Sequence, residues 1–116
     1  MLRRHLFEAY KKKRFSEAVT AGADMRKAYE LDWEALLILA HAEREAGQRE
    51  LALKDYTAFI AAYPNYVVTD DAQFYAAEIL VQEGKVEEAR ALFKAVADNP
   101  KSDFRTSAVA RLKALP

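Results

Sequence analysis

The chain has 116 residues, and its 18 lysines and arginines balance its 18 aspartates and glutamates, which gives a formal net charge of zero at pH 7. This balance argues against an overall field that draws the protein to nucleic acid or to an anionic membrane, and the lack of cysteine excludes disulfides and thiolate metal sites. With 52% hydrophobic residues but only three glycines and three prolines, the composition is that of a soluble globular protein built mostly from helices.

The first segment, MLRRHLFEAYKKKRF, has the pattern of an amphipathic helix, with Leu2, Leu6 and Ala9 along one face. A transit peptide is the alternative because of the early arginines, but Glu8 argues against it, and the segment lacks the continuous apolar core of a secretory signal. No apolar run approaches the roughly 20 residues that span a bilayer. We therefore expect a cytoplasmic protein without membrane insertion, or a periplasmic one if an export signal was trimmed.

The basic run KKKR at residues 11 to 14 is the strongest cluster of like charge in the sequence. Binding of nucleic acid or a membrane would need this run to extend across a face with interleaved aromatic residues. The alternative is a helix C-terminus, where the helix dipole favours cations. The neutral total charge favours this alternative, so we expect no nucleic acid partner.

The rest of the chain reads as a repeat. Aligning Gly47 with Gly84 superimposes the residues around them at an offset of 37. The matched pairs are Leu37 with Phe74, Ala40 with Ala77, Ala52 with Ala89, and Tyr56 with Phe93. An offset of 34 from Ala52 leads back to Ala18, and periods of this size indicate stacked supersecondary units. Three such units fit in the chain.

The second unit shows how each unit forms two helices. Asp32 is a plausible N-cap for a helix over residues 33–46, and Gly47 follows the last turn, where a left-handed residue without a Cβ is favoured. A second helix is predicted over 49–62 and is stopped by Pro64. Gly47 therefore ends one helix so that the next can fold back on it.

The third unit repeats this pattern after a longer connection, YPNYVVTDD. Asp70 and Gln73 resemble a capping pair, Gly84 closes the first helix, and a second helix runs over 86–98 before Pro100. The YVV stretch has the composition of a strand, but no second strand is predicted to pair with it. We therefore expect a connection there.

The last segment, SDFRTSAVARLKAL, places Phe104, Ala108, Leu112 and Leu115 on one helical face. The terminal unit of a stacked array has no neighbour on one side, so a helix with one apolar and one polar face is the expected cover.

These residues resemble the tetratricopeptide repeat family, whose unit is a pair of antiparallel helices of about 34 residues. The resemblance lies in LLILAHAEREAGQRELALKDYTAFIAAYP and FYAAEILVQEGKVEEARALFKAVADNP. The first unit is degenerate, with Lys13 where the glycine belongs and Gly22 where the aromatic residue belongs. The spacing within the second and third units also resembles repeat domains of bacterial cell-envelope proteins.

The resemblance implies an all-α fold, a right-handed superhelix of three helical hairpins with a C-terminal capping helix. We expect one domain over 1–116. Its parts are a degenerate repeat at 1–31, a repeat at 32–68, a repeat at 69–101 and the capping helix at 102–116.

Enzymatic function finds no support in the sequence. The two histidines, His5 and His41, lie in different predicted helices, and no metal-ligand spacing, nucleophile elbow or phosphate-binding loop occurs. His41 and Glu45 share a helical face, but two possible ligands do not make a metal site. We expect no enzyme activity, no cofactor and no bound metal.

Binding is the function that remains, and the resemblance implies that the first helix of each unit lines a concave groove for a peptide or helix. Helical spacing then predicts the groove residues: Arg3, Phe7, Tyr10, Lys11, Leu37, His41, Arg44, Phe74 and Glu78. Some family members bind the terminal carboxylate of a partner with polar and basic residues at fixed groove positions. Those positions hold Phe7, Ile38 and His41 here, so a partner bound by its terminal carboxylate is not expected.

The alternative is a structural or oligomerisation domain of a larger envelope or secretion-assembly protein, with a second copy of the chain as a possible partner. In that case Phe7 and Tyr10 pack against another helix and are not open to a ligand.

Overall fold

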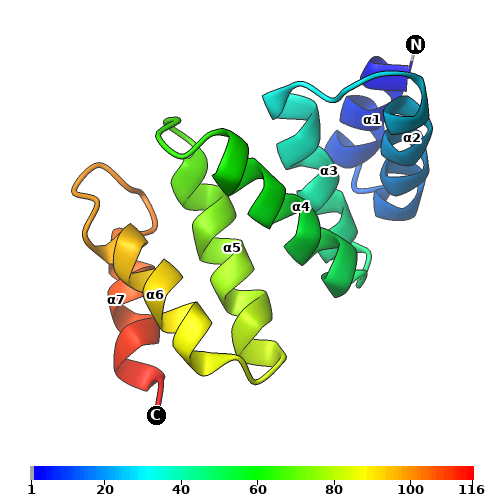
Figure 1. The fold of residues 1–116 in the computed structure, drawn as a ribbon. Helices are drawn as coiled ribbons and strands as arrows, with labels where there is room; N and C mark the ends of the chain where they lie inside the picture. Colours follow the sequence, from blue (N-terminus) through cyan, green and yellow to red (C-terminus); the bar gives the residue numbers. More distant parts are fainter. Residues whose placement is uncertain (1) are drawn as a thin grey trace. The chain divides into compact units, whose positions relative to one another are not determined.

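The computed structural model describes residues 2–116, which form seven α-helices and no strand (Figure 1). The helices are α1 (Leu2–Lys11), α2 (Phe15–Ala28), α3 (Trp33–Glu45), α4 (Arg49–Ala62), α5 (Thr69–Gln82), α6 (Val86–Ala97) and α7 (Arg105–Ala114). The YVV stretch lies in the turn between α4 and α5, as expected. Within this described part of the chain, no helix is both long enough and apolar enough to cross a membrane.

Three tight turns reverse the chain, after α1, α3 and α5. Each turn contains one residue with positive φ: Lys13 at 61°, Gly47 at 82° and Gly84 at 79°. In all three, the N–H of this residue donates to the carbonyl three residues before it, and the following N–H donates to the carbonyl five residues before it. Both bonds satisfy carbonyls that the helix end leaves without partners. The two predicted glycine turns are confirmed, and the first unit makes the same turn with a lysine.

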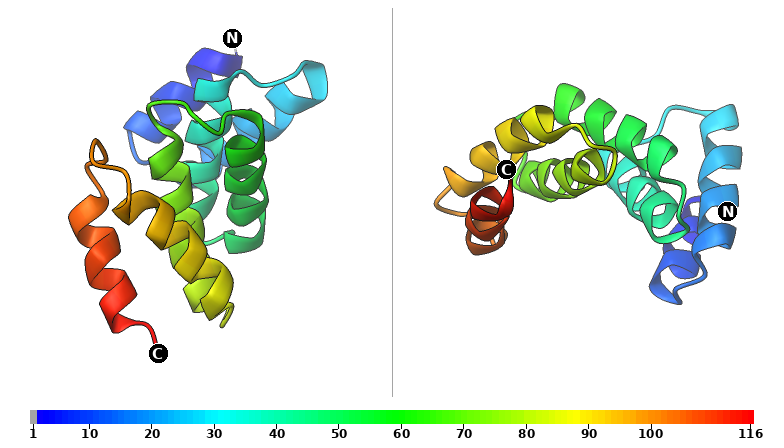
Figure 2. Two further views of the ribbon diagram at one scale, coloured as in Figure 1. Left: turned by 60° about the vertical axis from the view of Figure 1, so that its left-hand side comes forward. Right: turned by 90° about the horizontal axis from the view of Figure 1, so that it is seen from below.

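The chain divides into two compact units, residues 1–55 (unit 1) and residues 56–116 (unit 2). In unit 1, α1 and α2 form a hairpin against which α3 packs (Figures 1 and 2). Their contact surfaces are apolar, with Leu6 and Met25 almost completely buried. Each such side chain contributes about 1.5–3 kcal/mol to folding. A Cβ at Gly22 would lie only 2.5 Å from Cδ1 of Leu39, so the glycine lets α2 approach α3 closely.

Unit 2 contains the second part of α4 and the helices α5, α6 and α7. Its centre is an aromatic cluster in which the Phe74 ring lies 4.8 Å from Phe104, 5.6 Å from Phe93 and 5.5 Å from Tyr75, measured between ring centroids. Ala108 on α7 is fully buried, as the predicted apolar face of this helix requires. α7 and the preceding Phe104 therefore cover the end of unit 2, the helix with apolar contacts and Phe104 with aromatic ones. The predicted four-part division of the chain stays a prediction.

The two predicted N-caps have different outcomes. Asp32 caps α3, since its side chain accepts a hydrogen bond from the N–H of Ala35. The predicted capping pair at Asp70 is wrong, because α5 already begins at Thr69 and Asp70 accepts a hydrogen bond from the Ser102 hydroxyl. The Thr69 hydroxyl instead donates to the carbonyl of Tyr63 and accepts from the N–H of Tyr66, which fixes the connection before the helix.

Candidate functional site

The helices α1 and α3, both in unit 1, carry most of the predicted groove residues. At one end of this face, the Arg3 guanidinium lies 4.4 Å from the centroid of the Phe7 ring and forms ion pairs with Asp32 at 3.0 Å and Glu34 at 2.9 Å. Burial raises the pKa of Asp32, but the hydrogen bond and charge of Arg3 outweigh this effect and hold the pKa below its usual value. The Phe7 ring is half-buried, with an arginine lying over it.

Further along the same face, three side chains from α1 and α3 lie together. The rings of Tyr10 and His41 stack with 6.2 Å between centroids, and Nη1 of Arg44 lies 3.2 Å from Nδ1 of His41. Burial and the Arg44 charge lower the pKa of His41 to about 3, so the imidazole is neutral at physiological pH. An arginine can only donate, so Nδ1 is the acceptor and the hydrogen sits on Nε2. His41 therefore acts as a packing and hydrogen-bonding residue.

A depression of about 300 Å³ lies beside these residues, where α1 and α3 end and α2 begins. It is lined by Tyr10, Lys11, Lys13, Phe15, Arg44 and Glu45. Tyr10 and Phe15 meet edge to face with 5.6 Å between centroids and form its aromatic side. Three cations against one carboxylate leave its lining with a net charge of +2.

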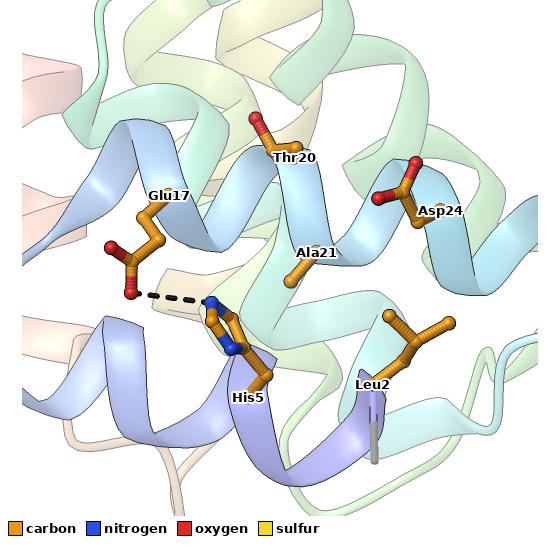
Figure 3. A pocket seen from close by; sticks show the side chains of 6 residues that line it. All are labelled: Leu2, His5, Glu17, Thr20, Ala21 and Asp24. Carbon is orange, nitrogen blue, oxygen red and sulfur yellow. Dashed lines mark ion pairs between the residues drawn. The ribbon is translucent and has the colours of Figure 1, made fainter.

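A second hollow, of about 440 Å³, lies between α1 and α2 (Figure 3). It is lined by Leu2, His5, Glu17, Thr20, Ala21 and Asp24. Nε2 of His5 lies 3.2 Å from Oε2 of Glu17, so these two groups pair with each other across the hollow. In the described residues, no three histidine or acidic side chains come together in a way that could hold a metal ion.

The two predicted groove residues of unit 2 are covered by α7. Phe74 is 4% exposed within the aromatic cluster. Nε of Arg111 lies 2.9 Å from Oε2 of Glu78, and the Arg111 guanidinium lies 5.7 Å from the centroid of the Phe74 ring. In unit 1, Leu37 is also buried, at 6% exposure. Phe74 and Leu37 are therefore packing residues in this structure, while Lys11 is exposed and Phe7 and Tyr10 are half-buried.

Sequence reasoning missed Lys13 and Phe15, which both line the depression. The available signal was the lysine at the glycine position of the first turn, because that turn places its side chain beside the end of α3. In the sequence, this lysine marks a degenerate glycine position and belongs to the basic run expected at a helix C-terminus, and neither interpretation places it at a binding site.

The comparisons with known proteins identify the fold. The family model of the tetratricopeptide repeat matches residues 34–66 and 71–102. A search of curated protein sequences finds no match. Among solved structures, PcrH in complex with the chaperone-binding region of PopD is similar with a TM-score of 0.81 and 23% identity, over 97% of this chain and 86% of that one.

The type III secretion translocator chaperone SycD of Yersinia enterocolitica is similar with a TM-score of 0.78 and 22% identity, over 97% of this chain and 79% of that one. SycD in complex with a peptide of the translocator YopD is similar with a TM-score of 0.77 and 22% identity, over 97% of this chain and 88% of that one. These likenesses confirm the predicted all-α fold of tetratricopeptide-like hairpins with a further C-terminal helix. The narrower resemblance to cell-envelope proteins stays a prediction.

Proposed function

Since the chain belongs to the tetratricopeptide repeat family, we propose that it is a non-enzymatic module that binds a peptide segment of another protein on the face formed by α1 and α3. The observation that carries this proposal is the depression beside Tyr10, where aromatic and cationic side chains from α1, α2 and α3 surround an open space. Large aromatic side chains next to arginine are typical of binding hot spots.

The similar solved structures support the same function. PcrH is seen with the chaperone-binding region of PopD, and SycD with a peptide of the translocator YopD. By analogy, the partner of this chain is a segment of a bacterial secreted protein, held before or during its export. The cytoplasm is then the compartment, with the periplasm as the alternative.

The side chains on this face also fit binding better than catalysis. His41 is neutral and buried, and its Nδ1 accepts a hydrogen bond from Arg44, so it is poorly placed to take up a proton at physiological pH. Arg3 is held by two carboxylates and Arg44 is paired with Glu45 at 3.2 Å. Such groups fix the shape and charge of a surface, whereas acid–base catalysis needs a group whose pKa lies near the working pH.

A display library of random peptides tests the proposal directly. We expect peptides that bind the intact chain to bind Phe7→Ala and Tyr10→Ala variants at least about 30-fold more weakly, which corresponds to about 2 kcal/mol for a hot-spot residue. Tyr29→Ala is the matched control, because Tyr29 is an exposed tyrosine of unit 1 that does not line the depression. Circular dichroism checks that each variant remains folded. Enrichment no greater than for an unrelated helical protein would refute the proposal.

The alternative function is a structural domain that pairs with a second copy, and the hollow between α1 and α2 is the observation in its favour. Its lining includes the apolar side chains of Leu2 and Ala21, which another helix could cover. Sedimentation equilibrium of the wild type and an Ala21→Glu variant distinguishes the two cases. A wild-type dimer that the substitution dissociates supports the structural domain, and a monomer at all concentrations excludes self-pairing.

A further inference from the structure

We propose that the depression at the ends of α1 and α3 is a subsite for an acidic residue followed by an apolar one. In this subsite Lys11, Lys13 and Arg44 face the carboxylate of the partner, and Tyr10 and Phe15 contact its apolar neighbour. The inference rests on the proposed function for the nature of the partner, a protein segment. It adds the chemistry by which that segment is recognised.

The backbone of Lys13 gives the first reason. Two turns of the same shape use Gly47 and Gly84 at the left-handed position, while the first turn uses a lysine with φ of 61°. A side chain in this conformation is unfavourable, because its Cβ crowds the following carbonyl. Among residues 2–116, Lys13 is the sole residue other than glycine with a positive φ. An unfavourable backbone at a cavity wall indicates that the side chain has a role there.

The charges give the second reason. Within the described chain, neither Lys11 nor Lys13 forms an ion pair, and both line the depression together with Arg44. Glu45 balances one of the three cations, which leaves room for one or two carboxylates of a partner. A single exposed ion pair contributes little to binding, but several cations around one carboxylate beside aromatic rings contribute more.

The same observations favour a protein segment over a nucleic acid as the occupant. The depression has a volume of about 300 Å³, which suits side chains and not a polymer backbone with its series of phosphates. Glu45 at the rim would repel such a series, and the chain as a whole has no net charge. Tyr10 and Phe15 offer an apolar contact for the residue next to the acidic one.

The first experiment uses two capped hexapeptides, one alternating phenylalanine with glutamate and one alternating phenylalanine with glutamine. Nuclear magnetic resonance titration of the intact chain at low salt follows the backbone amides. We expect the acidic peptide to shift signals of residues 10–15 and 44–45 and to bind about ten-fold more tightly than the glutamine peptide. Added salt should reduce this difference.

The second experiment separates stability from binding. In Lys13→Gly, we expect the melting temperature of the free protein to rise, because glycine relieves the left-handed backbone, and the preference for the acidic peptide to fall to less than three-fold. Lys13→Asn should show the same loss of preference, because asparagine tolerates the left-handed backbone but carries no charge. Lys12→Gln is the matched control, because Lys12 is exposed beside the depression without lining it, and it should keep the preference.

The outcomes distinguish this inference from the proposed function. Equal binding of the two hexapeptides, an unchanged preference in Lys13→Gly, or tighter binding of a single-stranded DNA oligonucleotide to the same residues would overturn the acidic subsite. If display-selected peptides still bind the α1 and α3 face, the proposed function stands while the subsite fails. If the acidic hexapeptide binds the depression but the library gives no binder, the subsite stands and the broader function fails.

Discussion

Glu43 and Asp55 place two carboxyl groups in the interior of unit 1, each with 3% of the residue exposed. Nη2 of Arg26 lies 2.9 Å from one oxygen of Asp55, which leaves Oδ2 of Asp55 and Oε1 of Glu43 buried and without a donor. The two side chains are within hydrogen-bond reach of each other. A proton held by Glu43 lets one carboxyl donate to the other, and burial together with the Asp55 charge raises the pKa of Glu43 well above its usual value.

This pair predicts a pH dependence of stability. In the unfolded chain Glu43 loses its proton near pH 4.5, whereas the folded chain holds it to a much higher pH. The stabilisation is therefore complete below about pH 4.5 and is lost as pH rises through neutrality toward the raised pKa. Glu43→Gln keeps a donor for Asp55 but cannot ionise, so we expect its free energy of unfolding to vary less between about pH 5 and about pH 8.

Urea unfolding at closely spaced pH values measures this difference. Asp98→Asn is the control, because Asp98 forms an exposed ion pair with Lys94 and should leave the pH dependence of the wild type unchanged. Parallel curves for Glu43→Gln and the wild type would show that Glu43 is ionised in the folded protein at neutral pH.

Single residues were predictable where their partners are local. Asp32 was predicted as an N-cap because its acceptor meets an N–H three residues along the chain. Asp70 has the same side chain in the first turn of α5, but its partner is Ser102, 32 residues away. The proximity of Glu43 and Asp55 was missed for the same reason, since sequence spacing does not show which carboxyl groups meet in the interior.

At the scale of helices, periodicity and turn residues predicted the bounds of three helices closely. The helix over 49–62 has the bounds of α4, and those predicted over 33–46 and 86–98 each end one residue earlier, as α3 and α6. Gly47 and Gly84 identify the turns because their positive φ is a local requirement. Gly22 was interpreted as a lost aromatic position, whereas its cause is the 2.5 Å between its missing Cβ and Leu39 of a neighbouring helix.

The contact between Gly22 and Leu39 predicts a coupling between two substitutions. Gly22→Ala gains about 1 kcal/mol of helix propensity but forces a methyl group against Leu39, and overpacking costs about 1–3 kcal/mol. We expect a net loss of stability of about 1 kcal/mol in the wild type. In a Leu39→Ala background, which opens this space, the same change should stabilise the protein by about 1 kcal/mol.

Urea unfolding of the four proteins in this double-mutant cycle measures the coupling. Gly47, in an exposed turn, provides the control, because a Cβ there would meet nothing within 4 Å. The effect of a substitution at Gly47 on the free energy of unfolding should therefore add to that of Leu39→Ala without coupling. Additive effects of Gly22→Ala and Leu39→Ala would mean that α2 and α3 can move apart to accept the methyl group.

At the scale of the whole molecule, helical spacing predicted which residues of α1 and α3 share a face but not what covers the matching face of α5. Phe104, just before α7, stacks on Phe74, 30 positions away, and Arg111 of α7 pairs with Glu78, 33 positions away. Phe7, Tyr10 and Lys11 of unit 1 are thus at least partly exposed, whereas Phe74 of unit 2 is buried under the Phe104 ring. The lysine turn adds a cation to the exposed part, which a reading of the repeat as degenerate could not predict.

Hydrogen exchange with and without a display-selected peptide tests this division over the full chain. A peptide at about 100 times its Kd stabilises the folded state by about 2.7 kcal/mol, and amides nearest the ligand gain local protection as well. We expect the largest added protection in α1 and α3, with α5 and α7 changing no more than the rest of unit 2. The reason is that a ligand reaching Phe74 must first displace the Phe104 ring and the Arg111 ion pair.

Phe7→Ala with the same peptide serves as the control, since it should reduce the protection in α1 and α3 without affecting unit 2. The opposite pattern, in which α5 gains protection while α7 loses it, would mean that the peptide replaces α7 on Phe74 and Glu78. Recognition would then include Phe74 and Glu78 of unit 2, and α7 would be a displaceable cover whose release limits the rate of binding.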